Sequence, residues 1–342
     1  MDFMPHLMMH LMMHFMTLLP LLLLSAAASA PDTIIFDTDC GFFGDDGSAL
    51  AMVLRSPEKV HVAGITVVSG NVWAAESALY LSEILGLLGH SEMQPRIGAQ
   101  MPLLHTPSMA ALEGPLEFQG AFSSPAKIAP STRPMALDLL TAAFEEHPGQ
   151  VTILALGPMT NVAMLLRLHP DLEKRIRLVF MGGNVHVPGN ASAAAEFNFW
   201  FDPEAAQAVL RSRIPEKVMF PLDICNRAVV TKPLFDEIVA AHTPVTERYG
   251  KDYGSRYPGF LTKPDAKGFL WDELAAAWLL DTGFVTKSDT AWLDVDTRFG
   301  KTYGATIPLD RKLAPDATPV RVMLDLDFAR VWALEKRLLT VR

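Results

Sequence analysis

Cysteine is almost absent from this chain, which carries only Cys40 and Cys225 among its 342 residues. A small domain held together by several disulfides is therefore excluded, and a chain of this length can bury enough apolar surface to fold without them. A bridge between Cys40 and Cys225 stays open as an alternative. Two buried free thiols is the interpretation that we favour.

Positive charge is scarce as well. Lys and Arg number 29 against 38 Asp and Glu, the net charge is −9, and no basic block occurs. Proteins that bind nucleic acid do so through clustered basic side chains, so the sequence predicts no nucleic-acid partner. Internal repeats and low-complexity tracts are also absent after Ala30.

The first thirty residues differ from the rest of the chain. The apolar stretch "FMTLLPLLLLSAAASA" ends in Ala28-Ser29-Ala30, a small-x-small pattern typical of a signal-peptide cleavage site. The stretch is short for a membrane-spanning helix. We predict a signal peptide over 1–30 and a mature domain over 31–342 that is secreted or periplasmic and free of the membrane. No Lys or Arg precedes the apolar stretch, so a later start or an uncleaved anchor stays open.

Beyond Ala30, segments typical of strands alternate with segments typical of helices. Strands are predicted at 33–39, 60–69, 151–156, 176–181, 218–224 and 320–326, and helices at 49–54, 74–88, 159–168, 203–212, 269–280 and 328–339. Asp202 and Pro203 supply an N-cap and a first-position proline to one of these helices. This alternation predicts one α/β domain with a doubly wound, mostly parallel sheet.

Two segments interrupt the alternation. Residues 101–133 are rich in proline, and residues 243–267 carry Tyr249, Tyr253 and Tyr257 at four-residue spacing. Long irregular segments inside a compact domain are often functional lids. For the tyrosines we favour one face of a short helix packed on the body of the domain over a lid that stacks on a substrate.

Polar side chains follow the predicted strands at the point where each strand ends. The first strand delivers Asp37 and Asp39, and then Asp45 and Asp46, all within ten positions. Later strand ends deliver Ser69, Asn71, the segment "GPMTN", the segment "MGGN" that begins at Met181, Asn190, Glu196, Asn198, Asp223 and Asn226. In an open parallel sheet these ends share one edge, which is where ligands bind.

Carboxylates this close repel one another unless a cation lies among them. Oxygen ligands without His or Cys suit Ca²⁺ or Mg²⁺, and a divalent ion would lower the pKa of a bound water that a neighbouring aspartate could deprotonate. The simpler explanation is helix capping, since acidic residues stabilise a helix N-terminus. Capping accounts for one of the four aspartates at most.

The segment "DTDCGFFGDD" resembles the N-terminal aspartate motif of the inosine-uridine preferring nucleoside hydrolase family, with two extra residues between the glycine and the acidic pair. Four further segments are similar to family blocks in the same order: "GITVVSGN", "LALGPMTNVA", "FMGGNVHVPGNASAAAEFNFWFDPEAA" and "LWDELAAA". The resemblance spans roughly 33–280. It implies a Rossmann-like doubly wound domain, a tightly held Ca²⁺, hydrolysis of the N-glycosidic bond of ribonucleosides, and a homodimer or homotetramer.

The resemblance also implies roles for single residues. It makes Asp39 a calcium ligand and the general base, and it makes Asp46, the carbonyl of Thr160, and Asp272 the remaining protein ligands. The substrate-binding residues that follow are Asp45, Asn71, Met181, Asn190, Glu196 and Asn198. Asp37 is expected to orient the ligands rather than to bind metal. If the stretch "EFN" is extended, Glu196 and Asn198 share one face and Phe197 lies on the other.

Two departures from the family pattern bear on specificity. The added residues within "FFG" are expected to enlarge or reshape the floor of the pocket. The position before Asp272, a histidine in the branch that accepts pyrimidines, is Trp271 here, which is similar to the purine-preferring branch. We predict that Trp271 lies against the base, where an indole face would stabilise a protonated purine ring by roughly 0.5–2 kcal/mol. His186 is an alternative acid, ranked below Trp271.

The sequence therefore predicts a nucleoside hydrolase that prefers purines and needs no organic cofactor. One alternative is a periplasmic nucleoside-binding protein without activity. Another is a phosphatase of the haloacid dehalogenase type, since "DTD" also begins that motif. That motif requires Thr or Val at the position of Gly41, which disfavours it.

Overall fold

The structure is a computed structural model that describes residues 30–113, 118–126, 135–313 and 315–341. The predicted signal peptide lies outside these ranges except for Ala30, as does part of the proline-rich segment 101–133. Within the described ranges, no helix combines the length and the apolar character needed to cross a membrane.

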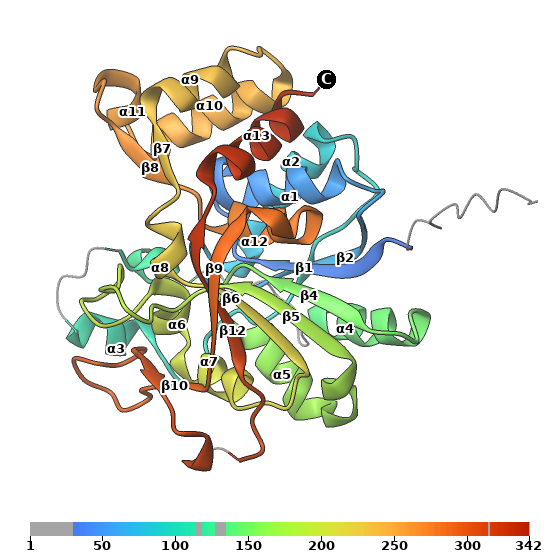
Figure 1. The fold of residues 1–342 in the computed structure, drawn as a ribbon, viewed down its shortest axis with the longest axis vertical. Helices are drawn as coiled ribbons and strands as arrows, with labels where there is room; N and C mark the ends of the chain where they lie inside the picture. Colours follow the sequence, from blue (N-terminus) through green and yellow to red (C-terminus); the bar gives the residue numbers. More distant parts are fainter. Residues whose placement is uncertain (1–29, 114–117, 127–134, 314, 342) are drawn as a thin grey trace, which may run out of the picture. The chain divides into compact units, whose positions relative to one another are not determined.

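The domain is built on one eight-stranded sheet with the strand order β3-β2-β1-β4-β5-β6-β12-β9 (Figure 1). Its strands are β1 (Asp32–Thr38), β2 (Val60–Val67), β3 (Arg96–Ile97), β4 (Val151–Ala155), β5 (Ile176–Met181), β6 (Glu216–Phe220), β9 (Val285–Ala291) and β12 (Val320–Leu326). All neighbouring strands are parallel except β9, which runs antiparallel to β12. The doubly wound, mostly parallel α/β fold predicted from the sequence is confirmed.

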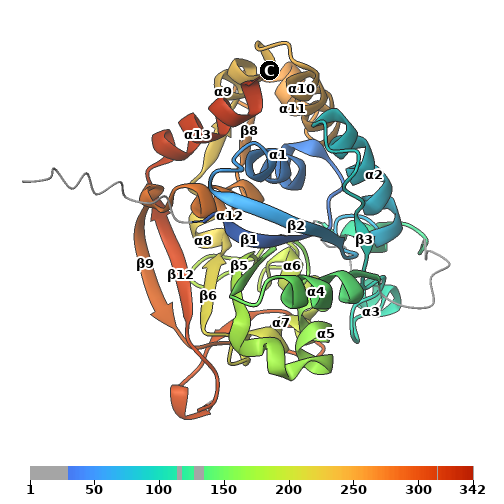
Figure 2. The same cartoon turned by 90° about the vertical axis from the view of Figure 1, so that its right-hand side faces the viewer.

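Helices cover both faces of this sheet (Figure 2). One face carries α1 (Ser48–Leu54), α2 (Ala74–Leu87), α12 (Asp272–Leu280) and α13 (Phe328–Thr340), and the other carries α4 (Met135–Glu146), α5 (Thr160–Leu168) and α7 (Pro203–Leu210). Successive side chains of a strand point to opposite faces. Ile34 and Phe36 of β1 accordingly join the core on the first face, whereas Ile35 joins the core on the second.

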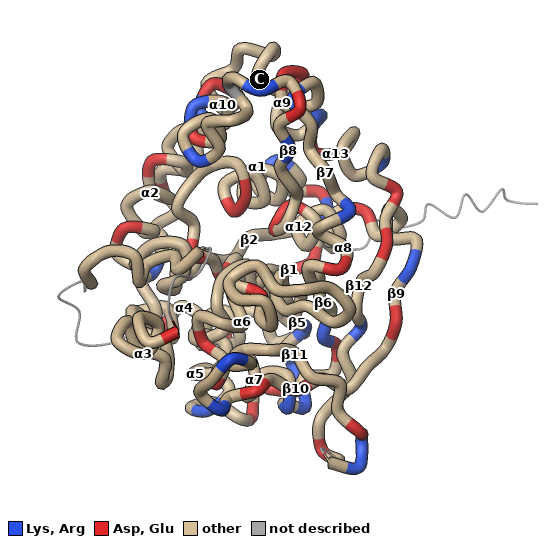
Figure 3. Tube along the Cα trace, turned by 90° about the vertical axis from the view of Figure 1, so that its left-hand side faces the viewer, with Lys and Arg blue, Asp and Glu red and all other residues tan. Residues whose placement is uncertain are grey.

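The remaining elements lie around the sheet. They are α3 (Pro107–Leu112), α6 (Phe197–Phe201), α8 (Leu222–Cys225), α9 (Lys232–Val239), α10 (Pro244–Arg256) and α11 (Gly259–Thr262), with two small antiparallel pairs, β7 (Val229–Thr231) with β8 (Lys267–Phe269) and β10 (Leu293–Val295) with β11 (Thr306–Pro308). Five short turns complete the list: η1 (Phe43–Gly47), η2 (Gly120–Ser123), η3 (Pro170–Arg175), η4 (Thr282–Phe284) and η5 (Arg311–Leu313). In the view of Figure 3, Lys and Arg and Asp and Glu are both scattered along the chain.

Several local predictions are confirmed. Helix α7 begins at Pro203, and the side chain of Asp202 caps it by accepting the amide of Ala205 at 3.1 Å. The tyrosine segment forms helix α10, with Tyr249 and Tyr253 buried against the domain. Both cysteines are buried free thiols.

Three local predictions differ most from the structure. The strand expected at 218–224 ends at Phe220, because Pro221 has no N–H for the sheet and a helical turn, α8, follows. The helix expected from Phe269 begins only at Asp272, since β8 holds Phe269 in an antiparallel pair with Val229. The stretch "EFN" is not extended but starts helix α6.

Candidate active site

A cavity of about 430 Å³ lies where strands β4, β5 and β6 end, so it occupies the carboxyl edge of the sheet. Residues from distant parts of the chain converge on it. Among those predicted from the sequence, the cavity lining contains Asp45, Asn71, Met181, Asn190, Glu196, Asn198, Trp271 and Asp272. The predicted substrate-binding residues are thus brought together, whereas Asp39, Asp46 and Thr160 are buried outside the cavity lining.

The acidic residues form a buried cluster at this edge. One carboxylate oxygen from each of Asp45, Asp46 and Asp272 lies within 4.8 Å of the others. The backbone N–H of Asp272 donates to Oδ1 of Asp45 at 3.2 Å, which ties the start of α12 to turn η1. Turn η1 begins at Phe43 of the segment "FFG", and its backbone departs from helical geometry at Gly44.

Electrostatics in this cluster oppose simultaneous ionisation. Burial, and next the charge of Asp46, raises the pKa of Asp39 well above its usual range. Burial, and next the charge of Glu273, raises the pKa of Asp45 well above its usual range. Burial, and next the charge of Asp45, likewise raises the pKa of Asp272. Burial raises the pKa of Asp46 to about 6, although the Thr38 hydroxyl that it accepts lowers it. The cluster therefore requires protons or a cation.

The Asp39 carboxylate is fixed by the chain that follows β2. Its Oδ2 accepts the backbone N–H of Asn71 at 2.6 Å, and its Oδ1 accepts the side-chain amide of Asn71 at 3.2 Å. Gly70 and Gly157 pack directly against it, since a Cβ on Gly70 would lie 1.9 Å from Oδ2 and a Cβ on Gly157 would lie 3.0 Å from the Asp39 Cβ. Glycine is required at Gly70 because the carboxylate occupies the space of a side chain.

For the ribonucleoside hydrolysis expected from the sequence, we predict that Gly70→Ala lowers kcat by about 10²-fold, because a displacement of roughly 1 Å in a reacting group costs that much. The added methyl group forces the Asp39 carboxylate to move. Steady-state kinetics on the folded variant measure the effect. Gly149→Ala is the matched control, because no atom lies within 4 Å of a Cβ at that position. Equal rates for both variants would contradict the close fit.

Other predicted polar residues have structural partners. The hydroxyl of Thr160 donates to Oδ2 of Asp202 at 2.6 Å. The amide of Asn161 donates to Oδ1 of Asp37 at 2.7 Å, and the hydroxyl of Thr66 donates to the same oxygen. Asp223 accepts the backbone N–H groups of Val185 and His186, each at 2.8 Å, and so shapes the loop after β5.

The start of helix α6 forms one wall of the cavity, which contains Glu196. The Glu196 carboxylate caps this helix and accepts the backbone N–H groups of Gly183, Asn198 and Phe199 at 2.7, 2.9 and 3.1 Å. Burial raises the pKa of Glu196 to about 7, although these N–H groups lower it. Because the stretch is helical, Phe197 lines the cavity together with Glu196 and Asn198 instead of facing away.

Trp271 lines the cavity directly before Asp272, as predicted. Its Nε1 is inaccessible and has no hydrogen-bond partner among the described residues, so the residue does not offer its N–H to the cavity. Its ring centroid lies 6.0 Å from that of Phe269. His186 is exposed and lies outside the cavity lining. Of the two residues predicted to act on the base, only Trp271 therefore lines the cavity.

Sequence reasoning did not identify several lining residues. The cavity also contains the cations Arg256 and Lys267 and the aromatic residues Phe42, Phe118, Tyr257 and Phe269. Phe42 belongs to the segment "FFG", which was expected to shape the pocket floor. Tyr257 is one of the three tyrosines at four-residue spacing, so the sequence had pointed to both residues. Arg256 and Lys267 lay inside the segment 243–267, but nothing in its pattern assigned them to the site.

A cavity lined by carboxylates and amides at the carboxyl edge of a parallel α/β sheet is typical of an enzyme active site. The family model of the inosine-uridine preferring nucleoside hydrolases matches residues 34–333, and the chain belongs to that family. It is thus an enzyme of N-glycosidic bond hydrolysis.

The proteins that this chain resembles differ in the nucleosides named in their descriptions. It is 34% identical to a pyrimidine-specific ribonucleoside hydrolase of Citrobacter koseri, over 86% of this chain and 93% of that protein. Two solved structures are similar at 25% identity. An inosine-guanosine nucleoside hydrolase has a TM-score of 0.75 and covers 91% of this chain and 99% of its own. A purine-preferring ribonucleoside hydrolase from Gardnerella vaginalis has a TM-score of 0.70 and covers 90% and 98%.

Proposed function

We propose that this chain cleaves purine ribonucleosides to the free base and ribose, with Ca²⁺ held by its acidic cluster. The observation that carries the proposal is that one cavity is lined by both kinds of side chain. It contains the carboxylates of Asp45, Asp272 and Glu196 and the amides of Asn71, Asn190 and Asn198. A sugar presents several adjacent hydroxyl groups, and these oxygen and nitrogen atoms can bind them. We place the enzyme outside the cytoplasm, on the basis of the N-terminal sequence alone.

The residues of the cluster fit a hard divalent cation. Asp45, Asp46 and Asp272 offer three oxygens within 4.8 Å of one another, and Oδ2 of Asp46 is buried without a hydrogen-bond partner among the described residues. Such an orphaned oxygen in an all-oxygen set suits Ca²⁺. We propose Asp39, Asp46, Asp272 and the Thr160 carbonyl as ligands, with Asp45 shared between cation and ribose. A bound cation would offset the clustered charge and lower the pKa of a nearby water.

The chain's own residues then perform the hydrolysis. Asp39 accepts the proton of the attacking water, and Asn71 holds both of its oxygens in place. Glu196, Asn190 and Asn198 bind the ribose, and the surrounding carboxylates stabilise the positive charge that develops on the sugar. Leu156, Met181 and Leu222 supply apolar surface to the cavity.

Purine preference rests on Trp271. The residue lines the cavity beside Asp272, and the aromatic residues Phe42, Tyr257 and Phe269 line it too. A bicyclic base covers more of such a surface than a single ring does. The Citrobacter koseri relative is named pyrimidine-specific, so the preference must be measured.

Purified protein assayed on inosine, guanosine, uridine and cytidine tests the function directly. We expect release of reducing sugar that stops in excess chelator and returns with Ca²⁺, and faster release from purines. A binding protein would hold nucleosides without releasing sugar, and a phosphatase would release phosphate from nucleotides instead. Faster cleavage of uridine and cytidine than of inosine would overturn the purine preference alone.

For Trp271→Ala we expect kcat/KM for inosine to fall by roughly 10- to 100-fold, since one base stacked on an aromatic side chain contributes about 1–3 kcal/mol. Uridine should lose less, and p-nitrophenyl riboside least, because its leaving group departs readily. Trp271→Phe keeps an aromatic face and should restore part of the loss. A parallel loss on all three substrates would assign Trp271 to the sugar or the cation instead.

A further inference from the structure

Two cations line the cavity that also holds the carboxylates. Arg256 ends helix α10, and Lys267 begins strand β8. Both residues are exposed, and neither forms an ion pair with an acidic side chain of the described residues. Within the described part of the chain, no carboxylate is therefore paired with either charge.

Aromatic rings hold the Arg256 side chain at the cavity. Its Cζ lies 4.4 Å from the ring centroid of Phe118 and 5.7 Å from that of Phe42, and both rings line the cavity. Contacts with aromatic faces fix a guanidinium without removing its charge. One of its N–H groups is directed at the hydroxyl of Tyr257, which also lines the cavity, and a guanidinium has five N–H donors, so others can serve a bound molecule.

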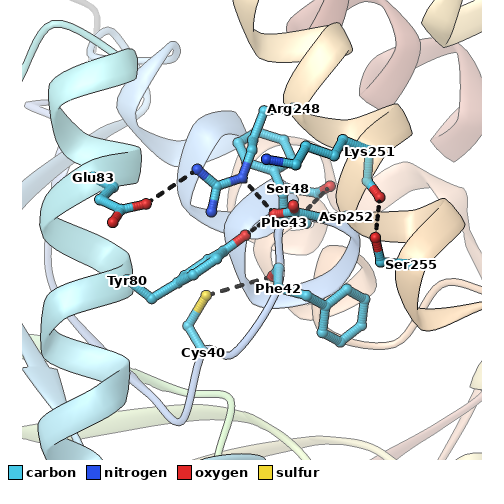
Figure 4. Close-up of polar contacts among 10 residues, drawn as sticks. All are labelled: Cys40, Phe42, Phe43, Ser48, Tyr80, Glu83, Arg248, Lys251, Asp252 and Ser255. Atoms are coloured by element: carbon cyan, nitrogen blue, oxygen red, sulfur yellow. Dashed lines mark hydrogen bonds and ion pairs between the residues drawn. The ribbon is translucent and has the colours of Figure 1, made fainter.

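Helix α10 is itself anchored upstream of Arg256 (Figure 4). Tyr80 of α2 donates to Asp252, which also accepts Nε of Arg248 at 2.6 Å, and the Arg248 Cζ lies 4.6 Å from the Tyr80 ring centroid. A Cβ on Gly44 would lie 2.2 Å from the Tyr253 ring, so α10 sits directly on the turn that carries Asp45 and Asp46. Arg256 is thus held at a set position relative to the acids.

This arrangement bears on how the base departs. When the bond from C1′ to the base nitrogen breaks, the electron pair stays on the base. The base then leaves either as a neutral molecule, after protonation, or as an anion. Two unpaired cations in the cavity oppose protonation of the base and stabilise an anion. They therefore disfavour the protonated purine that the sequence alone suggested.

We propose that Arg256, assisted by Lys267, stabilises the negative charge on the departing base, so that the cavity selects ribonucleosides whose base is a good anion. The inference rests on the proposed function. Water forms the new bond to C1′ and gives its proton to Asp39, the base takes the electron pair, and the anion gains a proton from solvent after release. Hypoxanthine and uracil, which carry acidic N–H groups, should leave faster than cytosine.

Inosine and 7-methylinosine separate this role from a structural one. The methylated base already carries a positive charge, so its departure develops no net negative charge. For Arg256→Gln we expect kcat/KM on inosine to fall on the order of 10²-fold, as for the loss of one charge-stabilising donor, and no loss on 7-methylinosine. Arg256→Lys should recover part of the inosine rate. Lys251→Gln, on the same helix but outside the cavity lining, is the matched control and should match wild type.

Equal losses on both substrates, or no loss on either, would overturn the role of Arg256 while leaving nucleoside hydrolysis intact. Wild-type protein that cleaves no nucleoside with Ca²⁺ present would instead overturn the proposed function, and the inference with it. Circular dichroism of each variant confirms that the comparison is made on folded protein.

Discussion

Asp39→Asn is expected to lower kcat on inosine by about 10²- to 10⁴-fold, the range typical of a lost general base. Asparagine keeps the size of the side chain and one carbonyl oxygen, but it cannot take the proton of the attacking water. KM should change far less than kcat, because Asn190, Glu196 and Asn198 still line the cavity.

The measurement is steady-state release of reducing sugar at saturating Ca²⁺. Asp32→Asn, at the exposed start of the same strand, is the control and should behave as wild type. A variant at Asp39 that retained a tenth or more of the wild-type kcat would show that another group accepts the proton.

Asp46→Asn should abolish detectable cleavage and Ca²⁺ binding together. The variant removes one charge from the cluster, while its side-chain carbonyl can still accept the hydroxyl of Thr38. In chelator it should unfold at or above the wild-type temperature, since burial disfavours the ionised form of Asp46 and raises its pKa to about 6.

With Ca²⁺ present, wild type should be the more stable of the two proteins, and Asp46→Asn the less stable. A ligand at 100 times its dissociation constant stabilises a folded protein by about 2.7 kcal/mol, so wild type should gain stability with Ca²⁺ and Asp46→Asn should not. Asp289→Ala, which removes an exposed acid on β9, should gain stability as wild type does. A full calcium-dependent shift in Asp46→Asn would exclude Asp46 as a ligand.

Local chemistry explains why part of the site could be predicted. Strand ends in a parallel sheet meet at one edge, so Asp45, Asn71 and Met181 could be assigned to one site from their places along the chain. The cap formed by Asp202 and Pro203 depends only on neighbouring residues, and it was predicted correctly.

Elsewhere local pattern was insufficient. The stretch at Glu196 could be extended or helical, and helix formation there depends on a carboxylate that caps its own backbone while accepting the amide of Gly183. Strand β8 pairs with β7 across a long intervening segment, with Val229 opposite Phe269. Neither partner is visible from a short window of sequence.

The sequence by itself determined the alternating α/β order, the chemistry of the acidic cluster and the position of Trp271 beside Asp272, because these follow from residue type, spacing and strand direction. Only the tertiary structure decided that Arg256 and Lys267 share a cavity with those acids. The physical reason is the packing of α10: its tyrosines bury against the domain, and the Arg248 contacts with Tyr80 and Asp252 set where its last turn lies. Helix packing therefore sets the sign of the charge on this side of the cavity.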